Sequence, residues 1–351
     1  MQGVPGGHME ERERKPVRRE TLKRWIIVFT LIAVTLFALA FFGGRWLEHR
    51  MEQPEERGDA HLRETLENVP EIEVNGQKYR LRQHQTTILL MGIDQFSDTQ
   101  VKNSYRNGGQ ADFLRLLVID PVEKQIRQIP IDRDTMTPIT ILGVLGNRTG
   151  TRTERISLSH GFGKGKEDSC QLTAEAVSNL LYDIPVNFFI ALNMDGISEM
   201  NDLLGGVTVT LEDDFSAIDP SMTKGTTLTL TGDQAEIFVR NRMSVGVGTN
   251  ESRMVRQQMY LSEAQKKLKA HLQADSNAAG TIFDALEPFL TTNFTRGRLI
   301  NEAYAAKDYA IEEPMQIAGE HSIDKEGFMQ FIVDEEKLQE TVLSVFYEKI
   351  V

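Results

Sequence analysis

Four arginines lie close together in residues 238–258, which read FVRNRMSVGVGTNESRMVRQQ. Arg240 and Arg242 precede a loop rich in glycine and valine, and Arg253 and Arg256 follow it. Planar guanidinium groups bind phosphate oxygens two at a time, so several converging arginines could hold a pyrophosphate. The alternative is that these arginines are solvated residues on helix faces, and spacing alone leaves both interpretations open.

The positions of these residues indicate how they could converge. Arg253 and Gln257 are four residues apart, so on a helix they share one face, one turn apart. Arg240 and Arg242 would point in nearly opposite directions on a continuing helix, and we therefore expect the helix to end between them. The glycine-rich loop would then let both sets turn toward one anion. Arg256 lies beside the shared face, and we expect it to pair with carboxylates instead.

Acidic residues stand at the ends of expected strands. Asp94 closes an apolar strand just after Gly92, and Asp112 precedes another strand. Ligands of α/β proteins collect at strand ends around a cleft, and two carboxylates there suit a Mg²⁺ ion that also binds phosphate. Arg133 and Asp134 follow a third strand in the same way. The alternative for each aspartate is a turn cap.

Apolar patterns predict the elements that must position these residues. Asn75 and Gly76 mark a two-residue hairpin turn within residues 71–82, and Thr231 and Gln234 form a capping pattern at a helix start. Expected strands cover 86–94, 113–120, 124–132, 187–193, 207–212 and 329–334, and expected helices cover 171–184, 196–206, 231–240 and 251–272. Residues 146–155 look like a loop rich in glycine, threonine and arginine. The predicted fold is α/β, with a mixed central β-sheet flanked by helices.

The composition excludes some classes of function. The 351 residues carry a net charge of −12, which argues against a nucleic-acid partner, because such proteins need a basic face. Cys170 is the only cysteine, so no intrachain disulfide can form.

Residues 25–44 (WIIVFTLIAVTLFALAFFGG) lack charge and are long enough for one transmembrane helix through a hydrocarbon core of about 30 Å. A cleaved signal peptide is the alternative, but its apolar run is shorter, about 7–15 residues. Seven Lys/Arg and four Asp/Glu precede the span, so the positive-inside rule predicts a cytoplasmic N-terminus. We expect a single-pass cell-membrane protein whose main domain lies outside the cytoplasm.

Short motifs along the chain resemble the LytR-CpsA-Psr family over roughly residues 86–270. Each motif is weak alone, but their shared order is specific. They are Gly92-Ile93-Asp94, Asp112, Ile129-Pro130 through Arg133-Asp134-Thr135, Gly205-Gly206-Val207, Leu230-x-Gly232-x-Gln234-Ala235, Val239-Arg240-x-Arg242, and Arg253-x-x-Arg256-Gln257-Gln258. The residue patterns predict a cytoplasmic tail (1–24), the transmembrane helix (25–44) and a stalk and hairpin (45–85). The resemblance adds a catalytic core (86–270), and we expect a C-terminal extension packed with the core (271–351).

The resemblance implies an enzyme that transfers a glycopolymer, such as a teichoic acid or capsular polymer, from a polyprenyl-pyrophosphate carrier to peptidoglycan. It implies an apolar groove for the lipid between sheet and helices, and Mg²⁺ (or Mn²⁺) as cofactor. The alternative is a non-catalytic polyprenyl-phosphate-binding or regulatory protein of the cell envelope. The implied roles are catalytic for Asp112, Arg133 and Asp134, pyrophosphate-binding for Arg133, Arg240, Arg242, Arg253 and Gln257, and metal-binding for Asp94 and Asp112.

The chain also departs from the family pattern. It has Gln110-Ala111-Asp112-Phe113 where the family usually has Arg-Ser-Asp-Thr, and two extra residues stand between Pro130 and Arg133. Arg155 and Ser157 replace a common lysine and asparagine. These departures put the choice of donor, the acceptor geometry and the level of activity in question.

Overall fold

The computed structural model describes residues 71–94, 109–143, 146–241, 245 and 250–350. The expected transmembrane helix, the cytoplasmic tail and most of the expected stalk lie outside these residues, as does Arg242. Within the described part of the chain, no helix combines the length and apolar character needed to span a membrane.

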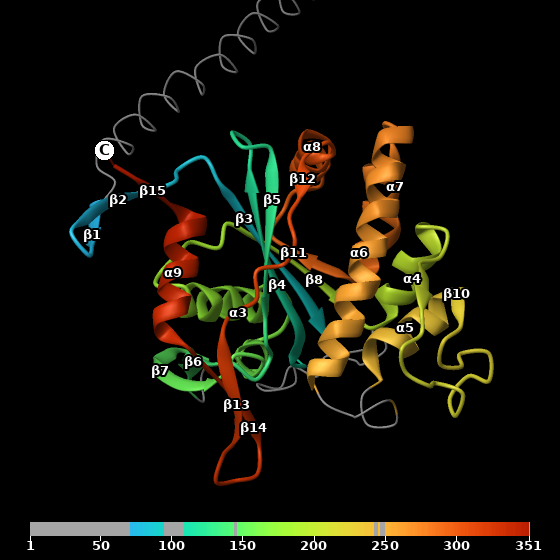
Figure 1. The fold of residues 1–351 in the computed structure, drawn as a ribbon, viewed down its shortest axis with the longest axis horizontal. Coiled ribbons are helices and arrows are strands. Elements are labelled where there is room, and N and C mark those ends of the chain that lie inside the picture. Colours follow the sequence, from blue (N-terminus) through green and yellow to red (C-terminus); the bar gives the residue numbers. More distant parts are fainter. Residues whose placement is uncertain (1–70, 95–108, 144–145, 242–244, 246–249, 351) are drawn as a thin grey trace, which may run out of the picture. The chain divides into compact units, whose positions relative to one another are not determined.

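A mixed six-stranded sheet forms the centre of the fold (Figure 1). Its order is β11-β8-β3-β4-β5-β12, and β3 pairs antiparallel with β4 and parallel with β8. The strands are β3 (Thr86–Ile93), β4 (Ala111–Asp120), β5 (Gln125–Ile131), β8 (Phe188–Asn193), β11 (Leu290–Thr292) and β12 (Ala310–Ile311). The apolar patterns of the central four strands thus predicted the core of the sheet.

One face of the sheet packs against α3 (Lys166–Leu180) and α9 (Glu335–Phe346). Leu89, Leu116 and Val118 point to this face, because side chains alternate along a strand. They pack with Val177 of α3 and other buried apolar residues in the largest core of the described chain. The C-terminal helix is therefore part of the main core.

The other face is covered by α6 (Asn250–Ala274), α7 (Ala278–Leu286) and α8 (Arg296–Ala306), seen opposite α9 in Figure 1. Ile88 and Leu90 point to this face and pack with Phe188, which stacks on Phe294 at 4.0 Å between ring centroids. A separate core holds the middle of α6 against α4 (Asp195–Leu203) and α5 (Gly232–Arg240). The capping box predicted for α5 is confirmed at Thr231 and Gln234.

Small sheets and hairpins complete the fold. The predicted hairpin is confirmed, since Asn75 and Gly76 take φ of 53° and 75°, as its two-residue turn requires. The remaining elements are β1 (Glu71–Val74), β2 (Gln77–Leu81), β6 (Met136–Leu142), β7 (Arg148–Arg155), α2 (Leu158–Gly161), β9 (Thr208–Thr210), β10 (Thr227–Thr229), the 3₁₀ turn η1 (Glu287–Phe289), β13 (Gly319–Ile323), β14 (Met329–Val333) and β15 (Tyr347–Lys349).

The prediction of a loop at residues 146–155 is wrong. Most of this segment is strand β7, paired antiparallel with β6 from Met136↔Arg155 to Leu142↔Arg148. Threonine alternates with arginine or glutamate at its C-terminal end, and β-branched threonines favour an extended chain. The two glycines in the segment suggested a loop, but the cross-strand hydrogen bonds outweigh their flexibility.

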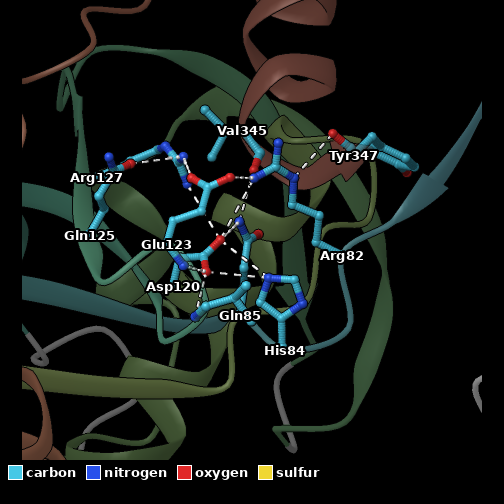
Figure 2. Close-up of polar contacts among 10 residues, drawn as sticks. Arg82, His84, Gln85, Asp120, Glu123, Gln125, Arg127, Val345 and Tyr347 are labelled. Atoms are coloured by element: carbon cyan, nitrogen blue, oxygen red, sulfur yellow. Dashed lines mark hydrogen bonds and ion pairs between the residues drawn. The ribbon is translucent and has the colours of Figure 1, made fainter. Parts of the chain in front are cut away.

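A polar network joins the C-terminal segment to the end of β4 in the central sheet (Figure 2). Asp120, whose side chain is 0% exposed, accepts hydrogen bonds from the Val122 and Glu123 amides at 3.0 and 2.9 Å. Gln85 donates both to Asp120 and to the carbonyl of Val345 at the end of α9. The network therefore joins the ends of β4 and α9.

Candidate active site

Asp112 occupies a β-bulge at the start of β4. Gly92 of β3 faces Phe113 and Ile93 faces Ala111, so Asp112 has no partner on β3. A bulge inserts one residue and redirects its side chain, and such bulges are common beside active sites. A side chain at Gly92 would place its Cβ 3.0 Å from the Cβ of Phe113, so glycine lets the two strands approach.

Two arginines converge on the Asp112 carboxylate. Arg133 donates from Nη1 to Oδ1, and Arg253 donates from Nη1 to Oδ2 at 3.1 Å. Arg133 also donates to the side-chain oxygen of Gln110. Both arginines therefore form ion pairs with the same carboxylate. This cluster, defined by Asp112, Arg133 and Arg253, is called the arginine cluster below.

Asp134 pairs with Arg133 of the arginine cluster. It is 4% exposed, and one of its carboxylate oxygens lies 3.6 Å from Nε of Arg133. Its backbone N–H donates to the carboxylate of Asp132 at 2.8 Å, which fixes the turn after β5. Burial raises the pKa of Asp134, and the neighbouring Asp132 charge raises it further against the opposing effects of Arg133, Arg155 and Arg253.

Arg240 stands at the end of α5, which stops at this residue as expected. It pairs with Glu236 at 3.2 Å and with Asp94 at 3.6 Å, and its side chain is 40% exposed. Asp94 therefore joins the site through Arg240. Arg242 belongs to the segment outside the described residues.

The start of α6 carries Arg253 and Gln257 as expected. Gln257 donates to the carbonyl of Val239 at 3.2 Å and so joins α6 to the last turn of α5. Arg256 is buried; it pairs with Asp213 at 2.8 Å and donates to the carbonyl of Phe238 at 3.2 Å. The expectation that Arg256 pairs with a carboxylate is confirmed.

A cavity of about 360 Å³ opens between the second face of the sheet and helices α6, α7 and α8. Arg240, Arg253, Asp112 and Gln257 line the cavity beside aliphatic and aromatic side chains. Its apolar lining includes Leu90, Ile190, Leu192, Met200, Tyr260, Leu268, Ile282, Phe283, Leu299 and Ala303. An apolar space therefore adjoins the site, between sheet and helices as the family resemblance implied. It is called the apolar cavity below.

A second cavity, of about 310 Å³, lies on the β5 side of β4 and shares Asp112, Phe113 and Gln257 with the apolar cavity. Arg133 lines it together with residues to which the sequence analysis assigned no role: Arg115, Asp132, Gln258, Gln316 and His321. It is called the polar cavity below. No sequence motif connects these residues, since His321 and its partner Asp132 are 189 positions apart.

The family model for LytR_cpsA_psr matches residues 51–344. The chain belongs to this family. Curated relatives include a Bacillus cereus TagU, 26% identical over 72% of this chain and 76% of that protein, and a Halalkalibacterium halodurans TagU, 31% identical over 59% and 60% respectively. Both are named polyisoprenyl-teichoic acid–peptidoglycan teichoic acid transferases.

Several solved structures share the fold of this chain. A Streptococcus agalactiae protein, gbs0355, has a TM-score of 0.62 at 22% identity and covers 74% of this chain and 86% of that protein. Bacillus subtilis TagT has a TM-score of 0.55 at 21% identity, with coverage of 75% and 90%. These similarities establish the mixed α/β architecture.

The acidic side chains of the site are the groups that could hold a divalent metal ion. Among the described residues, no group of three or more histidine, cysteine, aspartate or glutamate side chains is arranged to hold a metal ion. Mg²⁺, however, is usually held by one or two carboxylates, with phosphate oxygens and water completing its shell. Asp94 pairs with Arg240 and Asp112 with Arg253, so each carboxylate lies beside an arginine that could hold phosphate.

Proposed function

We propose that this LytR_cpsA_psr protein transfers a glycopolymer from a polyprenyl-pyrophosphate carrier to a sugar hydroxyl of peptidoglycan. The observation that carries the proposal is the apolar cavity with arginines in its lining. The name of the TagU relatives supports a teichoic acid as the polymer, and a chain of this fold is described as TagT bound to LI-WTA.

The apolar cavity suits the polyprenyl chain. Each buried CH₂ group contributes about 0.8 kcal/mol, so a cavity lined by leucine, isoleucine and phenylalanine can hold part of a long isoprenoid firmly. The cavity volume lies in the range of about 300–1,000 Å³ that is usual for small-molecule sites. The rest of the carrier would remain in the membrane, where the expected N-terminal helix would anchor the enzyme.

The arginine cluster and Arg240 suit the pyrophosphate. Phosphoryl transfer depends mainly on positioning and on neutralising charge, which guanidinium groups supply. Arg253 and Arg240 line the apolar cavity, and Arg133 reaches Asp112 from the polar side. Gln257, held by Val239, would add a neutral donor. A Mg²⁺ or Mn²⁺ ion on Asp94 and Asp112 would neutralise further phosphate charge when bound.

The reaction forms one bond to phosphorus and breaks another. The oxygen of the acceptor hydroxyl bonds to the phosphorus that carries the glycopolymer, and the P–O bond to polyprenyl phosphate breaks. Polyprenyl phosphate leaves with the electron pair, and the hydroxyl proton passes to a carboxylate. Asp112 lines both cavities, whereas Asp134 pairs with Arg133 and would hold it in place. We therefore assign proton acceptance to Asp112.

Turnover with a synthetic donor tests this proposal. The purified full-length chain in detergent would be given a polyprenyl-pyrophosphoryl glycan, a peptidoglycan fragment and Mg²⁺, and the phosphodiester product would be measured by mass spectrometry. We expect Arg240→Ala and Asp112→Ala to lose most transfer. Arg80→Ala is the matched control, because Arg80 is 43% exposed and pairs with Glu71 across the β1–β2 hairpin, which belongs to a sheet separate from the central one. Tight binding of the donor lipid without turnover under any metal condition would indicate the non-catalytic alternative.

A further inference from the structure

Arg115 is a buried cation in the lining of the polar cavity. It is 3% exposed and extends from β4, three residues after Asp112. Within the described ranges its partners are neutral: Nη1 donates to Gln128 at 2.9 Å, and the guanidinium lies 5.5 Å from the Phe113 ring centroid. Its Nε is buried without a hydrogen-bond acceptor there. Buried charges are normally paired, so this arginine lacks the anion that such a position calls for.

Burial changes the pKa of Arg115. Desolvation lowers its pKa to about 10, and no carboxylate counteracts the effect. The side chain remains charged near neutral pH, and a bound carboxylate would recover part of the lost hydration as a charge-assisted hydrogen bond. The cavity beside it offers space for such a ligand.

The rest of the polar cavity presents groups that suit sugar hydroxyls. His321, from β13, contacts the carboxylate of the turn residue Asp132 at 2.9 Å and packs on Phe331 with centroids 4.9 Å apart. This ring is therefore held firmly at the cavity wall. The side-chain oxygen of Gln258 is buried there with no donor among the residues that the structure describes. A hydroxyl group would satisfy it.

The relative positions of the two cavities fit two substrates that react with each other. The strand order places β4 between β3, which lines the apolar cavity, and β5, which lines the polar one. In phosphoryl transfer the attacking and leaving oxygens lie roughly in line on opposite sides of phosphorus. If polyprenyl phosphate leaves on the side of the apolar cavity, the attacking hydroxyl must come from the other side of Asp112. That side holds the polar cavity.

We propose that the polar cavity is the acceptor site and that it selects an acidic glycan, with a ligand carboxylate on Arg115 and ligand hydroxyls on His321 and Gln258. The inference rests on the proposed function for the side from which the acceptor hydroxyl attacks. Binding of the glycan in the cavity does not depend on turnover. Peptidoglycan strands supply both groups, through the carboxylates of their muramic acid or peptide portions and the hydroxyls of their sugars.

Two-substrate kinetics on the full-length enzyme tests the acceptor site. The acceptor is a soluble muramyl tetrasaccharide, compared with the same glycan after its carboxylates are converted to methyl esters. In the unaltered enzyme we expect esterification to raise the acceptor KM about tenfold, since a charge-assisted hydrogen bond is lost. Arg115→Gln should raise the acceptor KM for the acidic glycan similarly, make the two glycans equivalent, and leave the donor KM unchanged.

His321→Ala provides a second test if Arg115→Gln does not fold, with His271→Ala as the control, because His271 is an exposed histidine on α6. His321→Ala should raise the acceptor KM for both glycans, and His271→Ala should change nothing. A rise in the donor KM in place of the acceptor KM would overturn the assignment and place the glycopolymer of the donor in this cavity. Continued discrimination between the two glycans by Arg115→Gln would overturn the role of Arg115.

Direct binding separates failure of this inference from failure of the proposed function. Calorimetric titration with the muramyl tetrasaccharide alone, without donor, should give binding that is about tenfold weaker in Arg115→Gln. If the enzyme shows no transfer but retains this binding difference, the acceptor site stands and the proposed reaction fails. If the unaltered protein does not bind the glycan, the acceptor site is wrong whatever the transfer assay shows.

Discussion

Replacing Asp120 with asparagine tests the polar network at the end of β4 away from Asp112 (Figure 2). The substitution keeps the shape of the side chain but removes its charge. It leaves Arg82 and Arg127, each 3.7 Å from the carboxylate, without this partner. It also places an amide NH₂ where two backbone N–H groups and Gln85 now donate.

The expected loss of stability follows from these contacts. Removing one partner of a buried ion pair costs about 3–5 kcal/mol. Glu123 still pairs with Arg82 at 2.8 Å and with Arg127, and asparagine retains one oxygen as an acceptor. We therefore expect the lower value, a decrease of about 3 kcal/mol in the free energy of unfolding at pH 7. That corresponds to a decrease of about 6–12 °C in Tm for a domain of this size.

The effect should depend on pH in one direction. Burial opposes ionisation of Asp120, but hydrogen bonds from Glu123 and Gln85 and the charge of His84 outweigh it, so its pKa is lowered. A carboxylate with a lowered folded pKa stabilises the protein above its unfolded pKa of about 3.9 and loses that contribution as pH falls through the folded value. The difference between the two proteins should be full at pH 7 and shrink below about pH 4.

Thermal unfolding followed by circular dichroism at pH 7 and at acidic pH checks this expectation. Asp214→Asn is the control, because Asp214 also accepts a backbone hydrogen bond, from Ser216 at 3.1 Å, but is exposed. It should change Tm much less. An unchanged Tm in Asp120→Asn at pH 7 would refute the reasoning, as would a decrease of equal size at both pH values.

Three further perturbations address the strand contact, the thiol and the lipid site. Gly92→Ala should cost about 1–3 kcal/mol in urea unfolding and reduce transfer, because its Cβ would press on Phe113 beside the bulge, whereas Gly297→Ala, with nothing within 4 Å, should be neutral or stabilising. Cys170 should react with Ellman's reagent only after unfolding, since burial raises the pKa of its thiol to about 12; rapid reaction of the native protein would contradict this. Ala303→Phe should fill part of the apolar cavity and raise the KM for long polyprenyl donors more than for short ones, and equal effects on both would argue against a lipid site there.

The elements that position the site were predictable where local pattern decides structure. The apolar run of β3 predicted a buried strand, because its side chains pack in cores on both faces of the sheet. The amphipathic pattern of α3 predicted a helix, because its apolar side packs in the main core. The end of α5 at Arg240 followed from the spacing of the arginines. The strand β7 was not predicted, because glycines are typical of loops. Its extended conformation depends on pairing with β6, which the local sequence does not show.

The geometry of the site depended on contacts that no local pattern contains. Asp112 was selected from its place before a strand, but the bulge that redirects it arises from pairing with β3. Arg115 looked like one polar residue in an apolar strand, and only the packed structure shows it buried beside a cavity. His321 lies on the β13–β14 hairpin, 189 positions after its partner Asp132.

The two cavities assign a specific role to β4. Asp112 and Phe113 line both spaces and would contact both proposed substrates, whereas Arg115 lines the polar cavity and would contact the acceptor alone. The antiparallel pairing of β4 with β5 is regular from Leu114 to Asp120, which gives these positions a rigid support. Mutations that alter the bulge should therefore change donor and acceptor kinetics together, whereas changes at Arg115 should affect the acceptor alone. This contrast follows from the position of each residue on the strand.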